Sequence, residues 1–143
     1  MRNSNWTEED IYLIAELGHS LHLQGHYREA AIIFQGLVAV DPENHYCLEA
    51  LAAAWLALEE PGRAVGHIDT LLARRPDDLS ARARRLETVL LLGKLDAAVK
   101  DFEFLQHLLP AAETRRLQLA LEAAHRPRKN GRREQQSKLT SDN

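Results

Sequence analysis

The sequence is poor in the residues that mark several common protein classes. Cys47 is the only cysteine among 143 residues, so no disulfide can form within the chain. Seven glycines and five prolines are few for a multi-stranded β fold, which needs many turns, and they suit a helical one. Aromatic residues make up 6% of the chain and hydrophobic residues 45%, so aliphatic and alanine side chains must form most of the core.

Long apolar runs are also absent. The longest uninterrupted run covers residues 50–58, which is too short to cross a bilayer, and we expect no membrane insertion. Residues 1–10 are polar and acidic and lack the apolar centre of a signal peptide. Together with the single cysteine, this composition predicts a cytoplasmic protein.

The net charge of −3 is unevenly distributed. Residues 126–143 contain six Lys or Arg and two Asp or Glu, a net charge of +4, which leaves −7 on the rest of the chain. An acidic body is unlike a nucleic-acid-binding domain, whose folded face is usually basic, and we expect no nucleic-acid partner. Residues 126–143 have no apolar residue except Leu139, so we predict a disordered basic tail. The alternative is a tail that binds nucleic acid or a membrane surface.

Catalytic motifs are missing as well. The sequence has no glycine-rich phosphate loop, no CxxC pair and no HExxH motif, so we predict neither an enzyme nor a cofactor. His19 and His22 stand three residues apart, with His26 just beyond, and this spacing could bind a metal. No carboxylate or thiol is placed to complete the coordination shell, so we predict no metal site. Cys47 is interpreted as a small buried hydrophobe.

The residues that are present recur at helical spacing. Thr7 is a good N-cap with Asp10 three residues later, and it predicts a helix over residues 8–24 that Gly25 ends. A second helix is predicted over residues 27–40, ended by Asp41-Pro42. Each helix has an apolar stripe: Ile11, Ile14, Leu17 and Leu21 in the first, and Ala30, Ile33, Phe34 and Leu37 in the second.

The same pattern returns every 34 residues without an insertion. The columns that keep this interval are Pro42, Pro76 and Pro110; Ala30, Ala64 and Ala98; Phe34, Ile68 and Phe102; and Leu37, Leu71 and Leu105. The repeats are therefore 11–44, 45–78 and 79–112. Residues 113–125 form one further predicted helix, with Leu117, Leu121 and Ala124 facing the core.

Repeat 11–44 resembles the tetratricopeptide signature W-x2-L-G-x2-Y, A-x3-F, P, with Ile14 in place of Trp and Leu21 in place of Tyr. The matching residues are Leu17-Gly18, Gly25-His26-Tyr27, Ala30, Phe34 and Asp41-Pro42. The resemblance implies an all-α solenoid of three helix-turn-helix repeats plus a C-terminal capping helix, with a domain over 1–125 and a tail over 126–143. Repeat 79–112 has Arg82 and Arg85 where repeat 11–44 has Ile14 and Leu17, so we expect its first helix to be slightly rolled.

In such arrays the binding surface is the concave groove lined by the first helix of each repeat. The mixed lining suits an extended peptide or a short helix with apolar anchors. No Lys or Asn falls on it, so it does not resemble the carboxylate clamp of chaperone-tail-binding domains. For Leu56, Leu90 and Leu91 the alternative is burial in the core. The predicted groove residues are Tyr12, Glu16, His19, His22, Leu23, Tyr46, Glu49, Ala53, Leu56, Ala57, Ser80, Arg84, Glu87, Leu90 and Leu91.

A finer resemblance is to the first repeat of small bacterial type III secretion chaperones that hold translocator subunits. It is carried by Ile11-Tyr12, Ala15, Gly25-His26-Tyr27-Arg28-Glu29-Ala30, Phe34-Gln35-Gly36-Leu37 and Asp41-Pro42. It implies a cytoplasmic chaperone that holds an apolar segment of a secreted protein and keeps that protein monomeric. The chaperone itself is expected as a homodimer, or, as in chaperones for needle subunits, as a heterodimer with a small helical partner. A chaperone for an early export substrate or needle subunit, a generic scaffold, and a regulatory adaptor in a bacterial complex remain as alternatives.

Overall fold

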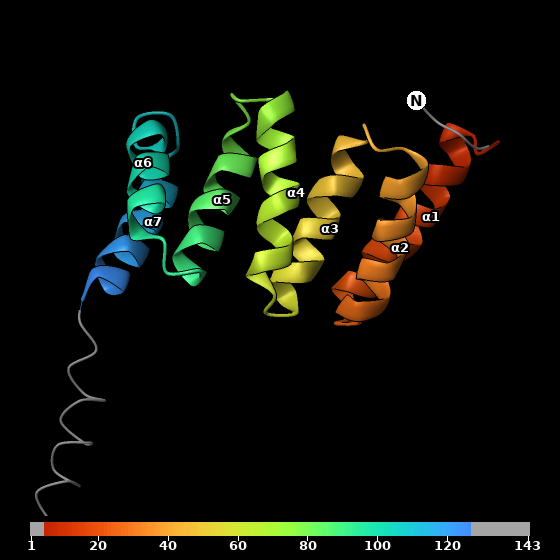
Figure 1. Ribbon diagram of the computed structural model, residues 1–143, viewed down its shortest axis with the longest axis horizontal. Helices are drawn as coiled ribbons and strands as arrows, with labels where there is room; N and C mark the ends of the chain where they lie inside the picture. The colour runs from red at the N-terminus through yellow and green to blue at the C-terminus, as the bar shows by residue number, and fades with distance from the viewer. Residues whose placement is uncertain (1–4, 127–143) are drawn as a thin grey trace, which may run out of the picture.

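The computed structural model describes residues 5–126, and within them every regular element is an α-helix. The helices are α1 (Glu8–Leu23), α2 (Tyr27–Val40), α3 (His45–Ala57), α4 (Pro61–Arg74), α5 (Leu79–Leu91), α6 (Leu95–Leu105) and α7 (Ala111–His125). Figure 1 shows them side by side in one row, in chain order, from α1 at one end to α6 and α7 at the other. The row consists of three helical hairpins followed by a closing helix that packs on α6 and α5, which confirms the predicted all-α solenoid.

Side-chain caps mark where α1, α3 and α5 begin, and the caps of α3 and α5 lie 34 residues apart. The Thr7 hydroxyl accepts from the Asp10 N–H (3.1 Å), while the Asp10 carboxylate accepts from the Thr7 N–H (2.8 Å). Asn44 and Asp78 cap α3 and α5 in the same way, accepting from the backbone N–H of the third following residue at 3.1 and 3.0 Å. These caps fix where each repeat begins.

The alanine and leucine columns lie in the core, whereas the proline column is exposed. Ala30, Ala64 and Ala98 are fully buried, and so are the leucines of the Leu37 column. One cluster of buried side chains spans repeats 11–44 and 45–78, and a second spans repeat 79–112 and α7. Leu117 of α7 is fully buried in the second cluster, so α7 covers the last apolar face as predicted.

Gly18 sets how closely α1 approaches α2. A Cβ added there would lie 2.9 Å from Ile33 Cγ2 and from two ring carbons of Phe34. Real Cβ contacts are longer, so only glycine allows this spacing without displacing a neighbour. The small residue at this position of the tetratricopeptide signature is therefore a packing requirement here.

Two predicted orientations were wrong. Leu17 is 53% exposed, and the buried residues of α1 are Ile11, Ala15 and Gly18. The stripe that faces α2 is thus rotated from the predicted one, because nothing among the described residues packs on the side of α1 where Leu17 lies. Ala124 is exposed, while Leu117 and Leu121 of the same helix pack in the second core cluster.

The arginines of repeat 79–112 reach carboxylates on both neighbouring helices. Arg85 Nη1 lies 2.8 Å from Asp101 Oδ2 on α6, and Arg85 Nε lies 3.0 Å from Asp69 Oδ1 on α4. Arg82 Nη1 lies 3.7 Å from Asp101 Oδ1, and Asp101 is buried. These ion pairs show how α5 accepts arginine at two columns that are apolar in repeat 11–44. The expected roll of α5 stays a prediction.

The predicted basic tail concerns residues that, apart from Arg126, lie outside the described part of the chain. Its disorder therefore stays a prediction. Within residues 5–126, none of the helices combines the length and the apolar character that crossing a membrane requires.

Candidate functional site

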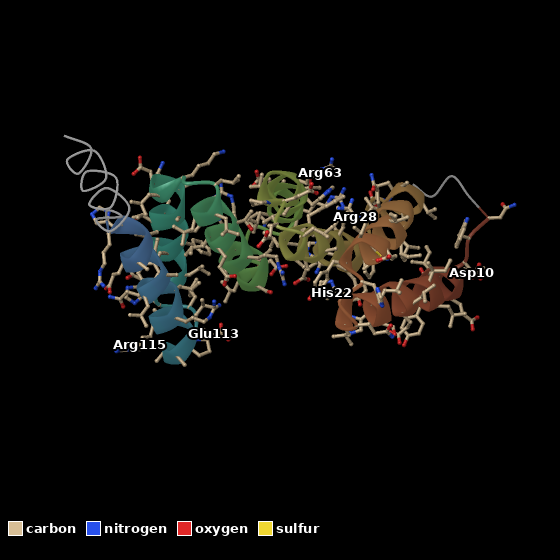
Figure 2. All side chains as sticks on the ribbon, turned by 90° about the horizontal axis from the view of Figure 1, so that it is seen from below. Asp10, His22, Arg28, Arg63, Glu113 and Arg115 are labelled. Carbon is tan, nitrogen blue, oxygen red and sulfur yellow. The ribbon has the colours of Figure 1, made fainter. Side chains whose placement is uncertain are left out.

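The first helices of the repeats share one side of the row. In Figure 2, His22 of α1 and Glu113 of α7 lie on the lower side, whereas Arg28 of α2 and Arg63 of α4 lie on the upper side. We call the surface formed by α1, α3, α5 and α7 the first-helix groove. Two adjoining hollows run along it.

The first hollow lies between α1, α3 and α5. Most of its surface is apolar, and it brings together six of the fifteen predicted groove residues. Those six come from three different repeats and line one hollow, while their role in binding a partner stays a prediction. The full lining is His19, His22, Phe34, Tyr46, Glu49, Ala50, Ala53 and Arg84.

Phe34 forms the floor of this hollow. Its side chain is buried, and its ring meets that of Tyr46 edge to face, with 6.2 Å between ring centroids and a 74° interplanar angle. Sequence reasoning assigned Phe34 to the core and missed that its ring also faces the groove. Ala50 was missed too, although it shares a column with Glu16 and Arg84, and that column could have identified it.

The second hollow lies between α5 and α7 and shares Arg84 with the first. It contains three predicted residues, Ser80, Arg84 and Glu87. Its other wall comes from the α6–α7 connection and α7, which sequence reasoning treated only as a cap. The full lining is Leu79, Ser80, Ala83, Arg84, Glu87, Leu109, Glu113 and Arg116.

Polar contacts along the groove link one helix to the next. The Ser80 hydroxyl donates to Glu49 Oε1 at 3.4 Å, and Arg84 Nη2 lies 4.0 Å from the same oxygen. Arg116 Nη1 donates to Glu87 Oε1 at 2.8 Å. Arg84 Nε is buried and has no hydrogen-bond partner. Two ion pairs, Arg84 with Glu49 and Arg116 with Glu87, thus lie within the groove.

The remaining predicted residues lie along the same helices with different exposure. Leu23 is 73% and Leu91 67% exposed, and Tyr12 and Glu16 are also exposed, so Leu91 is not a core residue. Leu56, Leu90 and Ala57 are half-buried. Leu56 packs against the first core cluster and Leu90 against the second, and neither lines the two hollows, so their place in the groove stays a prediction.

Two titratable side chains of the first hollow, His22 and Tyr46, have pKa values shifted in favour of their neutral forms. Burial, with the nearby charges of His19 and Arg84, lowers the pKa of His22. Burial, with the charges of Glu16 and Glu49 among its neighbours, raises the pKa of Tyr46. Near neutral pH these side chains therefore offer a neutral imidazole and a phenol, which suit apolar contacts with single hydrogen bonds.

The two histidines of α1, His19 and His22, both line the first hollow. His22 packs edge to face on Tyr27, with 5.0 Å between ring centroids and an interplanar angle of 66°. Between residues 5 and 126, no group of three His, Cys, Asp or Glu side chains is arranged to hold a metal ion.

No protein-family model matches the chain. Among curated proteins, it is 31% identical over 94 residues to the mouse DnaJ homolog subfamily C member 3, an alignment that covers 66% of this chain and 19% of the mouse protein. The chain thus spans about a fifth of the length of the curated relatives it matches.

Solved structures share the fold over most of the chain. PcrH from Pseudomonas aeruginosa, in complex with the chaperone binding region of PopD, has a TM-score of 0.74 at 24% identity, covering 85% of this chain and 96% of that one. The Yersinia enterocolitica type III secretion chaperone SycD, with a peptide of the translocator YopD, has a TM-score of 0.75 at 18% identity and the same coverage. The first tetratricopeptide domain of Spaghetti (RPAP3), bound to the HSP90 peptide SRMEEVD, has a TM-score of 0.70 at 26% identity, covering 81% and 96%.

Proposed function

We propose that this chain, which has the tetratricopeptide-repeat fold found in PcrH and SycD, is a protein-binding chaperone that holds an apolar segment of a partner in the first-helix groove. The partner is a secreted protein of a type III secretion system, and the chain works in the bacterial cytoplasm. Binding there keeps the segment from aggregating before export.

The observation that carries this proposal is the apolar hollow between α1, α3 and α5. It has a buried aromatic floor in Phe34 and a rim that includes Tyr46, and Leu23 and Leu91 stand exposed on the same helices. Exposed apolar side chains gathered along one surface typically mark a protein-binding site. One apolar side chain of the partner fits over Phe34, while further ones contact Leu23 and Leu91.

The neighbours support the same use of the fold. PcrH and SycD are solved with segments of PopD, PopB and YopD, so this architecture accommodates peptides. Arg84 and Arg116 are the basic residues that line the two hollows, and each lies near a glutamate of the groove. This pairing favours a partner that binds through apolar side chains over one that binds through an acidic terminus.

The test compares a groove variant with a matched variant on the opposite side. Tyr46→Ala with Leu23→Asp removes the rim aromatic and puts a charge on an exposed groove leucine. Ile32→Asp changes an exposed apolar residue of α2 in the same chemical way. Both variants should keep the circular dichroism and melting temperature of the unaltered chain, because all three residues are exposed.

The measurement is co-purification from the native host with the secreted proteins encoded beside the gene. We expect the unaltered chain and Ile32→Asp to bring down one small secreted protein in stoichiometric amount, and the groove variant to lose it. Retention of that protein by the groove variant would remove the groove from the proposal.

The alternative is a generic scaffold or regulatory adaptor in a bacterial multiprotein complex. The resemblance to about a fifth of a longer DnaJ homolog supports this alternative, since tetratricopeptide arrays also occur as modules within larger proteins. A scaffold would bring down large, stable complexes, whereas a chaperone would bring down a protein that aggregates when it is expressed alone.

A further inference from the structure

α1 exposes apolar side chains at the N-terminal end of the row, on a surface separate from the first-helix groove. Leu13 is 59% and Leu17 53% exposed, and Trp6, Asp10 and Ile14 lie beside Leu13 around a shallow hollow. We call Trp6, Asp10, Leu13, Ile14 and Leu17 the terminal face. Large apolar side chains exposed together need a physical explanation.

The 34-residue period shows how this face is used elsewhere in the chain. Leu13 and Leu17 share columns with Cys47 and Leu51 of α3, which are 0% and 1% exposed. Those two residues belong to the core where α2 packs against α3. Each leucine of the terminal face thus occupies a position that the next repeat covers with a helix.

In repeat 79–112, the helix that covers these two columns is α4, and one of the two contacts with it is an ion pair. There the same two columns hold Ala81, which is buried, and Arg85, which pairs with Asp69 of α4. Leucine at this column therefore matches an apolar covering helix, as in the α2–α3 contact, and not an acidic one.

The charges around the terminal face indicate which helix fits. The first turn of α1 carries the acidic residues Glu8, Glu9 and Asp10, and the helix has no Lys or Arg. A second copy of α1 packed antiparallel would bring its own C-terminal turns to these acids without a Lys or Arg, which disfavours a symmetric pair. Basic side chains beside an apolar stripe would instead complement these acids.

We propose that the terminal face binds an amphipathic helix of another protein, whose apolar stripe is flanked by Lys and Arg. The helix adds to the end of the row and packs antiparallel to α1, as α2 packs on α3. In that orientation its C-terminal turns lie near Glu9 and Asp10, so basic residues there pair with both acids and suit the partner helix's own dipole. This site is independent of the first-helix groove and does not require the function proposed for it.

The test uses a synthetic amphipathic peptide of about 18 residues, long enough to form a stable helix on binding, with a leucine stripe flanked by lysines. A matched peptide carries glutamate at every lysine position. Trp6 is the reporter, since it lines the terminal face and Trp55 is the only other tryptophan. Full-length chain with Trp55→Phe gives a fluorescence signal from Trp6 alone.

We expect the lysine peptide to shift the Trp6 emission to shorter wavelength and the glutamate peptide to leave it unchanged. Leu13→Gln with Leu17→Gln should weaken binding by at least about tenfold, which corresponds to ~1.4 kcal/mol. This pair keeps the net charge, so non-specific attraction between a basic peptide and an acidic chain would persist in it. The groove variant Tyr46→Ala with Leu23→Asp should bind the lysine peptide as the unaltered chain does.

Three results would overturn the proposal. They are equal binding of the two peptides, undiminished binding by the glutamine variant, and a homodimer in light scattering that the glutamine variant dissociates. Leu13→Gln alone serves if the double variant loses its helical circular dichroism. Unchanged binding by that folded single variant would likewise count against the terminal face.

Discussion

At the scale of single residues, the columns of the repeat explain where backbone strain lies. Gly25, Glu59 and Gly93 are 34 residues apart, and all three have positive φ, at 85°, 60° and 74°. Each ends the turn between the two helices of a repeat. Glycine adopts this conformation freely, whereas glutamate at Glu59 pays a steric cost.

Glu59→Gly should therefore stabilise the chain, by about 0.5–1 kcal/mol, because the strain is relieved at a small entropic cost. Gly93→Ala is the matched change in the opposite direction, and it should destabilise by about 1 kcal/mol. Urea unfolding followed by circular dichroism measures both. A less stable Glu59→Gly variant would show that the Glu59 side chain contributes more than its backbone costs.

Gly18 links the packing of α1 to the floor of the groove. Gly18→Ala would place a methyl group 2.9 Å from Ile33 and Phe34, so we expect a net destabilisation of ~1–3 kcal/mol through overpacking. Gly66→Ala in α4 meets nothing within 4 Å and should instead stabilise by ~0.5–1 kcal/mol through helix propensity. The difference between their denaturant midpoints checks the close contact. Equal midpoints would show that the helices separate without cost.

At the scale of helices, the 34-residue period predicted the repeated helices but not which side chains are exposed at the ends of the row. Residues 27–40 were predicted as a helix and form α2 as Tyr27–Val40, because Gly25 and Asp41-Pro42 define both limits locally. Leu17 was predicted to be buried, yet it is exposed, since periodicity does not reveal that no helix precedes α1 within residues 5–126.

Contacts between helices were the other part that sequence reasoning could not supply. The partners of Arg85 lie 16 residues away on either side, at Asp69 and Asp101, and only the packed helices bring them together. The place of Phe34 in the floor of the first hollow was missed for the same reason. Its buried ring borders a hollow only because α1, α3 and α5 pack around that hollow.

α7 contributes to stability mainly through one side chain. Leu117 is fully buried against the second core cluster, so Leu117→Ala should cost ~2–5 kcal/mol. Leu119 on the same helix is exposed, and Leu119→Ala should stay within ~0.5 kcal/mol. Thermal unfolding of the two variants makes the comparison. A small effect at Leu117 would mean that α7 does not close the array.

At the scale of the whole molecule, two half-buried histidines make stability depend on pH. Burial lowers the pKa of both His22 and His67 below their ordinary value of 6.5. The unfolded chain therefore takes up protons more readily than the folded chain as the pH falls below 6.5. The stability that these residues contribute is complete above pH 6.5 and is lost as the pH falls toward their folded-state pKa values.

We expect the melting temperature to fall between pH 7.5 and about pH 5.5, and His22→Gln with His67→Gln to reduce that fall. Melting curves of the full chain and the double variant at the two pH values measure the difference in slope. Identical slopes would show that neither histidine resists protonation in the folded state.

The central claim is that a partner chain lies along the first-helix groove. The most direct measurement is photo-crosslinking in the native host from a benzoylphenylalanine placed at His19, which lines the first hollow, or at Lys100, an exposed residue of α6 on the opposite side. The account predicts that position 19 crosslinks to one small secreted protein through an apolar segment and that position 100 does not. Equal crosslinking from both positions, or crosslinking from position 100 alone, would contradict it.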